Sequence, residues 1–280
     1  MDNFVVFILS HGRANNVHTF KTLKKHGYTG KIIIVIDNED KTSDDYYKNF
    51  DNVEMFNKEK ISKTFDEADN FGDRRAIVYA RNACFEIAKE KGYEYFIQMD
   101  DDYTGFNYRI YNENNTKPKT IKNLDSVFLA LLDFYKNTPF ATISMAQGGD
   151  FIGGKNNRMA QRPTIYRKCM NSFICSTKRP FKFIGRINED VNTYTHEQSK
   201  GLLMGTIPMV SLTQKTTQKN KGGMTDIYLD NGTYVKSFYT VIFSPSCCII
   251  KPMGDTNKRL HHSINWENAV PKIIRETLKK

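Results

Sequence analysis

Three consecutive acidic residues follow a short apolar run near the middle of the sequence. Asp100, Asp101 and Asp102 come directly after Glu94–Met99, which predicts a buried strand. Neighbouring carboxylates repel one another, and a hard divalent cation between them relieves that repulsion. Ligands of open α/β sheets bind beyond the carboxyl ends of the strands, where these acids would lie. The stretch therefore predicts a metal site, with a solvated acidic turn as the alternative.

A second acidic pair lies much later in the chain. Glu189 and Asp190 open a polar segment that predicts a helix running towards Lys200. Carboxylates in the first turn of a helix are stabilised by its dipole, which is reason enough for their presence. The pair alone therefore indicates a helix start and no particular chemistry.

Two further strands should deliver polar residues to the same place as the three acids. Phe4–Leu9 is an apolar run suited to a strand covered on both faces, and it stops at Ser10–Arg13. Lys31–Ile36 predicts a second strand, which ends at Asp37, and apolar residues at helical spacing lie between the two. A strand, helix and strand in succession build a parallel sheet through a right-handed crossover. We therefore expect Ser10–Arg13, Asp37 and Asp100–Asp102 at one edge of the sheet.

The helix expected before the acidic strand carries basic residues. It should span residues 73–91 and stop at Gly92. Arg75 and Arg81 fall in its N-terminal half, where a phosphate-binding metal site next to the helix could use them. A solvent-exposed position is the alternative for both.

The remaining pattern completes an α/β fold. Apolar runs predict strands at residues 140–145, 173–177, 203–212 and 246–251, and helical periodicity covers residues 124–135. There is no internal repeat, linker or second core, so one domain over residues 1–280 is expected. Its sheet should be mixed, mostly parallel and flanked by helices.

Composition limits the class of protein. The 280 residues include 41 Lys and Arg against 31 Asp and Glu, a net charge of +10 that favours a polyanionic partner, with a merely soluble basic protein as the alternative. No apolar segment approaches the ~20 residues that span a membrane, and the chain opens directly into a strand, so neither membrane attachment nor secretion is expected. The five cysteines are an odd number without CxxC spacing. A reducing cytoplasm without a zinc site is the simplest interpretation.

In their order, these motifs resemble the nucleotide-sugar half of GT-A fold glycosyltransferases, most nearly the inverting family-2 type. There, a helix carrying Ala-Arg-Asn, here Ala80-Arg81-Asn82, precedes an Asp-x-Asp motif, and a later Glu-Asp pair at a helix start supplies the base. The resemblance covers roughly residues 4–200. It departs from the family in the third aspartate inside the Asp-x-Asp motif and in the absence of a Gln-x-x-Arg-Trp signature.

The resemblance implies a GT-A, Rossmann-like fold, with the nucleotide-sugar half at about residues 1–102. An acceptor half with a C-terminal metal and diphosphate segment would follow at about residues 103–280. It implies a UDP-sugar donor and Mn²⁺ or Mg²⁺, with Asp190, next to Glu189, as the catalytic base of an inverting transfer. Metal binding is implied for Asp102, Asp100 and either His261 or His262. Donor binding is implied for Ser10, His11, Gly12, Arg13, Asp37, Arg75, Arg81, Asp100, Asp101 and Lys258.

The expected acceptor is double-stranded DNA. Small basic GT-A proteins similar to this one occur among bacteriophage enzymes that glycosylate hydroxymethylated pyrimidines in DNA, and such an enzyme would work in the host cytoplasm. The target base would have to be flipped out of the duplex to reach Asp190. Alternatives are a glycan or protein acceptor, a nucleotidyltransferase of related fold, and a non-catalytic nucleic-acid-binding module. The residues expected to contact DNA phosphates are Lys155, Arg158, Arg162, Lys215, Lys219 and Lys221.

Overall fold

The structure is a computed structural model that describes residues 3–109, 118–151, 157, 162–215, 227, 230, 232, 234–254 and 258–279. The strands are β1 (Phe4–Leu9), β2 (Ile32–Asp37), β3 (Val53–Phe56), β4 (Tyr95–Asp100), β5 (Tyr103–Tyr108), β6 (Lys119–Thr120), β7 (Phe140–Ala146), β8 (Ser172–Ser176), β9 (Leu203–Gln214), β10 (Cys248–Met253) and β11 (Arg259–Ile264). The helices are α1 (His18–Lys25), α2 (Ser43–Asn49), α3 (Lys58–Ser62), α4 (Val78–Glu90), α5 (Leu124–Lys136), α6 (Glu189–Ser199), α8 (Val235–Phe243) and α9 (Trp266–Ala269), with 3-10 turns η1 (Gly148–Phe151) and η4 (Glu276–Leu278).

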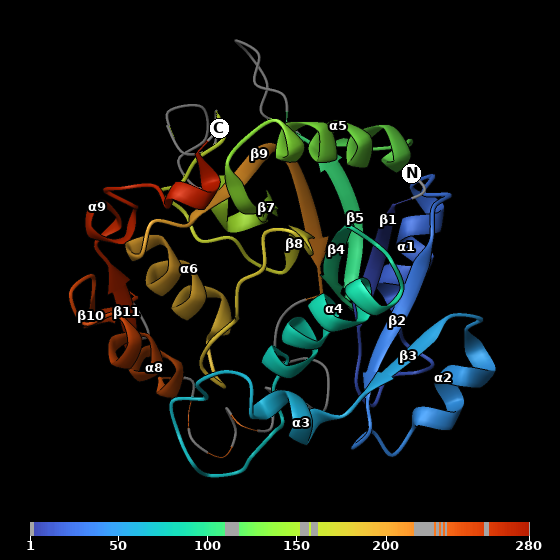
Figure 1. Cartoon of the computed structure of the whole chain (residues 1–280), viewed down its shortest axis with the longest axis horizontal. Coiled ribbons are helices and arrows are strands. Elements are labelled where there is room, and N and C mark those ends of the chain that lie inside the picture. Colours follow the sequence, from blue (N-terminus) through green and yellow to red (C-terminus); the bar gives the residue numbers. More distant parts are fainter. Residues whose placement is uncertain are drawn as a thin grey trace.

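A nine-stranded mixed sheet forms the centre of the molecule, in the order β3-β2-β1-β4-β8-β7-β9-β5-β6 (Figure 1). The strands β3, β2, β1 and β4 are mutually parallel, as are β7 and β9, whereas β8 and β5 run against their neighbours. This confirms the expected α/β class with a mixed sheet. The hairpin of β10 and β11 forms a separate two-stranded sheet beside α8 and α6.

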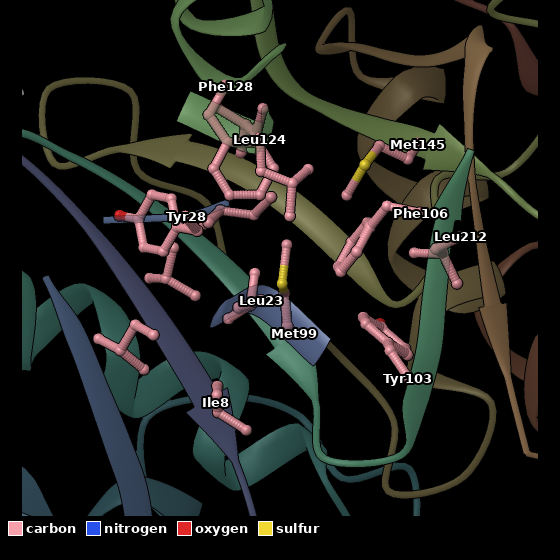
Figure 2. Close-up of a cluster of buried hydrophobic side chains, with 14 of the residues drawn as sticks. Ile8, Leu23, Tyr28, Met99, Tyr103, Phe106, Leu124, Phe128, Met145 and Leu212 are labelled. Atoms are coloured by element: carbon pink, nitrogen blue, oxygen red, sulfur yellow. The ribbon is translucent and has the colours of Figure 1, made fainter. Parts of the chain in front are cut away.

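Both faces of the sheet are buried under helices. Alternate residues of β1 point to opposite sides, so that Ile8 joins an apolar cluster with α1 and α5, whereas Phe7 joins another with α4. Figure 2 shows the first cluster, in which Leu23 of α1, Met99 of β4 and Phe128 of α5 converge. Strands covered on both faces read as continuous apolar runs, which is why β1, β2 and β4 were predictable.

The helix before the acidic strand is shorter than the sequence suggested. It begins at Val78 and not at residue 73, because the Asp73 side chain accepts a hydrogen bond from the backbone N–H of Arg75 (3.1 Å) and caps a turn there. Consequently Arg75 lies in an exposed connection, whereas Arg81 remains inside the helix.

Helix α6 starts at Glu189, as predicted, but its polar first half is buried. Residues 189–195 are all buried, and α8 lies along the helix. Asn188 Nδ2 donates to Thr240 Oγ1 (2.6 Å), which in turn donates to Asn192 Oδ1 (2.8 Å). Thr195 and Ser244 hydroxyls bond one turn further along (2.9 Å). These hydrogen bonds between buried side chains hold the two helices in one relative position.

The five cysteines are all free and all buried. Within the described residues, no helix combines the length and the apolar character needed to cross a membrane.

Candidate active site

The polar ends of β1 and β4 meet at Asp101, as the sequence predicted. Ser10 Oγ donates to Asp101 Oδ2 (2.6 Å), and Arg13 Nη1 lies 3.0 Å from Asp101 Oδ1. Because the Ser10 hydrogen is used in this bond, the Tyr46 hydroxyl, 2.7 Å away, is the donor to Ser10. Asp101 is thus a buried, fully paired carboxylate that fixes the loop after β1.

Asp37 at the end of β2 lies at the same edge and has two basic partners. His11 Nδ1 lies 2.7 Å from one of its oxygens and Lys58 Nζ 2.9 Å from the other. Burial would raise the pKa of Asp37, but His11 and Lys58 outweigh it and lower the pKa below its usual value. Gly12, at a φ of 68°, donates its N–H to Asp40 Oδ2 (2.6 Å), so the turn needs a left-handed residue there. No sequence signal pointed to Lys58, whose side chain is buried.

Asp100 and Asp102 differ from Asp101 in being poorly compensated. Burial and the neighbouring carboxylates raise the pKa of Asp100 to about 7, against the opposing effect of Arg81. Burial and Asp101 raise the pKa of Asp102 to about 6. Asp102 Oδ1 is buried and has no hydrogen-bond partner among the described residues. Asp102 thus has a buried oxygen without a donor among the described residues, and the neighbouring Asp100 also has a raised pKa. Two such carboxylates suit a hard divalent cation.

Arg81 joins the acidic strand to helix α6. Its side chain is 1% exposed and donates from Nη2 to Asp100 Oδ1 and from Nε to Glu189 Oε1, both at 2.9 Å. The guanidinium lies over the ring of Phe173, 4.8 Å from its centroid. Of the three arginines in the predicted donor site, Arg13 pairs with Asp101, and Arg81 is buried between two carboxylates. Arg75 is exposed and bonds to Asp73 and Asp230.

Asp190 has a different partner from Glu189. Lys168 Nζ lies 2.6 Å from Asp190 Oδ2, and the backbone N–H of Val191 donates to Oδ1 (2.8 Å). Burial alone would raise the pKa of Asp190, but Lys168 and this N–H together lower it. Asp190 is therefore ionised and held in one orientation. Lys168 lies in a loop without any recognisable motif, so sequence reasoning missed it.

The two candidate metal-binding histidines lie on β11. His261 Nδ1 is 2.7 Å from the carbonyl oxygen of His262, and His262 Nδ1 is buried without a partner among the described residues. Burial, His261 and Lys168 lower the pKa of His262 to about 3, and Asp190 opposes them. Both histidines thus lie on the Asp190 side of the site. The described part of the chain contains no group of three or more His, Cys, Asp or Glu side chains arranged to hold a metal.

The basic residues expected on DNA separate into two kinds. Lys155, Arg158, Lys219 and Lys221 lie outside the described residues. Arg162 is exposed, whereas Lys215 lies against the acidic strand end. Its backbone N–H donates to the carbonyl of Asp102 (3.1 Å), and its Nζ lies 2.6 Å from His18 Nε2. Lys258 is exposed at the start of β11.

A family comparison bears on this arrangement of acids. Residues 4–223 match the family described as TET-Associated Glycosyltransferase. The chain belongs to this family. It is therefore a glycosyltransferase, and the nucleotidyltransferase and non-catalytic interpretations are set aside. The matched region of this TET-associated glycosyltransferase contains the strand-end acids, Arg81 and the Glu189–Asp190 pair.

Comparisons with individual proteins add little. Two structures of glucosyl-3-phosphoglycerate synthase from Mycobacterium tuberculosis are similar to the TET-associated glycosyltransferase chain, one in complex with Mn²⁺, UDP and phosphoglyceric acid and one with Mg²⁺ and UDP. Each has a TM-score of 0.43 and 8% identity, and the alignment covers 94% of this chain and 87% of the other. No curated protein matches the chain.

Proposed function

We propose that this glycosyltransferase moves a sugar from a UDP-sugar to a hydroxyl acceptor by an inverting displacement. The observation that carries the proposal is the bridge formed by Arg81. It ties Asp100, at the strand end suited to a metal-bound diphosphate, to Glu189 at the start of the helix that bears Asp190. A donor-binding edge and a candidate base are thereby held in one rigid assembly.

The donor would lie at the edge formed by β1, β2 and β4. The loop at Ser10–Arg13 and the carboxylate of Asp37 would face the nucleoside, and Lys215 would approach the diphosphate from the end of β9. We assign Lys215 to this side because its main chain is bonded to that of Asp102. Exposed Lys258 has no described contact that favours a role.

Asp102 and Asp100 would hold Mn²⁺ or Mg²⁺. The fit rests on the partnerless oxygen of Asp102 and on the raised pKa of both groups, because a bound cation favours their ionised forms. Such a cation neutralises charge that develops on the leaving diphosphate. The charge of Asp190 acts on the pKa of His262, the neighbour of His261 on β11, so we propose neither histidine as a metal ligand.

Asp190 would accept the proton of the acceptor hydroxyl. Lys168 keeps this carboxylate ionised, and the N–H of Val191 orients it. A general base must be ionised and fixed before the hydroxyl attacks the anomeric carbon. Glu189 is held by Arg81, so its part is to position the start of α6.

We propose a hydroxymethylated pyrimidine in double-stranded DNA as the acceptor and the cytoplasm as the place of reaction. The net charge of +10 and the resemblance to bacteriophage DNA-modifying enzymes support the acceptor, and the name of the family adds an association with TET. Five buried free thiols support a reducing compartment. A glycan or a protein hydroxyl is the competing acceptor.

The test is UDP release from each UDP-sugar with Mn²⁺, measured with and without hydroxymethylated duplex DNA. We expect DNA to stimulate release with one sugar, and Asp190→Asn to reduce kcat by several orders of magnitude without changing UDP affinity. Stimulation by a glycan and not by DNA would replace the acceptor. A product of retained anomeric configuration would contradict the role of Asp190.

A further inference from the structure

Three amide side chains meet at the sheet edge that carries the acids. Gln147 follows β7, Asn171 precedes β8 and Gln214 ends β9. Gln147 Nε2 and Asn171 Nδ2 both donate to Gln214 Oε1, at 3.0 and 3.1 Å. Because β7 and β9 are parallel and β8 runs against both β7 and β4, the three residues lie at the edge where β4 ends. We call Gln147, Asn171 and Gln214 the amide cluster.

Hydrogen bonds join the amide cluster to the strand-end acids. Lys215 comes directly after Gln214, and its backbone N–H donates to the carbonyl oxygen of Asp102 (3.1 Å). Gln214 is paired with Tyr103 in the ladder of β5 and β9, and the Tyr103 hydroxyl donates to the carbonyl oxygen of Asn171. Asn171 has a φ of 60°, a left-handed conformation that asparagine adopts more readily than most residues. The cluster is thus fixed on the side of the site where the donor diphosphate would bind.

A second set of contacts joins the cluster to the proposed base. Asp150 accepts a hydrogen bond from the backbone N–H of Gln147 (2.8 Å) and forms an ion pair with Arg167. The next residue, Lys168, has its Nζ 2.6 Å from Asp190 Oδ2. The amide cluster is therefore connected through bonded residues to both ends of the site.

The amide groups keep polar atoms available to a ligand. Both of the hydrogen bonds within the cluster end at Gln214 Oε1. No described residue forms a hydrogen bond with Gln214 Nε2, Gln147 Oε1 or Asn171 Oδ1. All three side chains are half-buried, so they are accessible from the sheet edge. A carboxamide has two N–H donors and an acceptor oxygen, and the cluster therefore offers both donors and acceptors.

A sugar ring suits the position and the chemistry of the cluster. The attacking hydroxyl displaces the diphosphate at the anomeric carbon, so the ring must lie between the diphosphate and the base. The side chains next to the cluster are charged, Lys215 towards the strand-end acids and Lys168 towards Asp190. The cluster itself is neutral and combines donors with acceptors, as sugar hydroxyls do. It can therefore hold a neutral ring without altering the charge of Asp190.

We propose that Gln147, Asn171 and Gln214 bind the hydroxyl groups of the transferred sugar and so determine which UDP-sugar is used. The proposal rests on the proposed function, since it places a UDP-sugar at the strand-end acids. The ligand is the neutral sugar ring of the donor, and the selectivity for it comes from residues at three separate strand ends.

The first experiment measures the binding of UDP and of UDP-sugars separately, with Mn²⁺ and without acceptor. The probes are UDP, UDP-glucose, UDP-galactose and UDP-N-acetylglucosamine. Gln147→Met and Gln214→Met keep the length of the side chain and remove the amide, whereas Asn171 is retained because few side chains adopt its φ. The control is Asn137→Leu, which removes an exposed amide bonded to Asp133 at the opposite edge of the sheet, before β7 begins.

We expect both methionine variants to bind UDP as the wild type does and to bind the preferred UDP-sugar about tenfold more weakly, which corresponds to one lost hydrogen bond. Asn137→Leu should change neither affinity. Equal weakening of UDP and UDP-sugar would overturn the proposal, because the amides would then act on the diphosphate or on the fold. Unchanged binding of every UDP-sugar would also overturn it, and a raised acceptor KM in that case would place the amides at the acceptor.

A second measurement varies the ligand. The ratio kcat/KM is compared for the preferred donor and for analogues that each lack one sugar hydroxyl. In the wild type, loss of a hydroxyl bound by the cluster should lower kcat/KM by about tenfold or more. In the variant that lacks the partner amide, the same loss should have little effect, because the hydrogen bond is already absent. A wild type indifferent to every sugar hydroxyl would refute the proposal without any variant.

Failure of the proposed function is a different result. A chain that binds a UDP-sugar through the amides but releases no UDP would refute the transfer and keep the sugar-binding site. A chain that binds UDP but no UDP-sugar would refute the sugar-binding site together with the proposed donor.

Discussion

Asp102 has a buried Oδ1 atom for which the described residues offer no hydrogen-bond donor. An amide at this position keeps the shape of the side chain but loses the charge that a cation needs. We expect Asp102→Asn to abolish sugar transfer and to weaken Mn²⁺ binding at least tenfold, with the thermal midpoint preserved or raised. UDP release and Mn²⁺ titration measure these effects, and Asp44→Asn on exposed α2 is the control. Near-normal turnover of Asp102→Asn would eliminate the metal site.

The same carboxylates should make stability depend on pH. The pKa values of Asp100 and Asp102 in the folded chain, about 7 and about 6, lie above the usual value near 4. Between these values the folded state binds more protons than the unfolded state. The contribution of the two groups to the free energy of unfolding is therefore complete below about pH 4. It is lost as the pH rises to about 7, by on the order of a few kcal/mol.

Urea denaturation of metal-free protein from pH 4 to pH 7.5 measures this loss. Comparison with Asp102→Asn isolates the acids at the strand end from other titrating groups, and Mn²⁺ should restore stability at pH 7. If stability depended on pH in the same way in the wild type and in Asp102→Asn, the pKa of Asp102 would not be raised in the folded chain.

Lys168 should set the acidic limb of the activity profile. It opposes the effect of burial on Asp190 and holds that pKa below its usual value. Lys168→Met removes the opposing charge, so the pKa of Asp190 rises and the acidic limb of kcat moves to higher pH. Profiles of kcat against pH test this, with Lys178→Met, which breaks a surface pair with Glu94, as the control. An unmoved limb would mean that another group is the base.

At the scale of elements, one arginine connects a helix, a strand and a second helix. Arg81→Met leaves Asp100 and Glu189 buried without their counter-ion, which should lower the free energy of unfolding by about 3–5 kcal/mol. Adding Glu189→Gln removes one uncompensated charge, so it should recover part of the loss although activity stays low. Urea denaturation measures both.

Arg75→Met is the matched control for Arg81→Met. It removes an exposed arginine whose partners are also on the surface, and it should change stability by less than about 1 kcal/mol. Equal losses in the two variants, or strictly additive effects of Arg81→Met and Glu189→Gln, would argue against a coupling role of Arg81.

The sequence alone predicted the elements whose own residues form a recognisable pattern. β1, β2 and β4 are apolar runs, and α6 begins at an acidic pair. In contrast, α8 contains Val235, Phe238 and Ile242 without a side-chain cap, a composition equally typical of a strand. β11 consists largely of basic and histidine residues, and its pairing with β10 decides its conformation. The same holds for the site. The acids at the strand end were predictable from their neighbours in the sequence, whereas the ion pair of Arg81 with Glu189 joins residues 108 positions apart and was not.

At the scale of the whole molecule, the net charge of +10 predicts DNA binding that weakens steeply with salt. Arg162→Ala and Lys215→Ala remove one charge each from different places. Arg162 is exposed, so its loss should flatten the plot of log affinity against log salt by about one unit. Lys215 adjoins Asp102, so its loss should raise donor KM and leave the slope unchanged. Binding titrations at several salt concentrations and donor kinetics distinguish the two. The reverse pattern would exchange the assigned roles.

The reactivity of the buried cysteines can report local unfolding of the chain. Cys84, Cys169 and Cys175 lie in the apolar core on the α4 side of the sheet. Cys247 joins the same core just before β10, and Cys248 is the first residue of β10 in the hairpin. A thiol that is at most 4% exposed reacts with an alkylating reagent only after its surroundings separate. Mass spectrometry of alkylated peptides would therefore time the opening of the sheet and of the hairpin separately in the unmodified chain. The native cysteines alone would then show whether UDP slows the opening of the sheet or that of the hairpin.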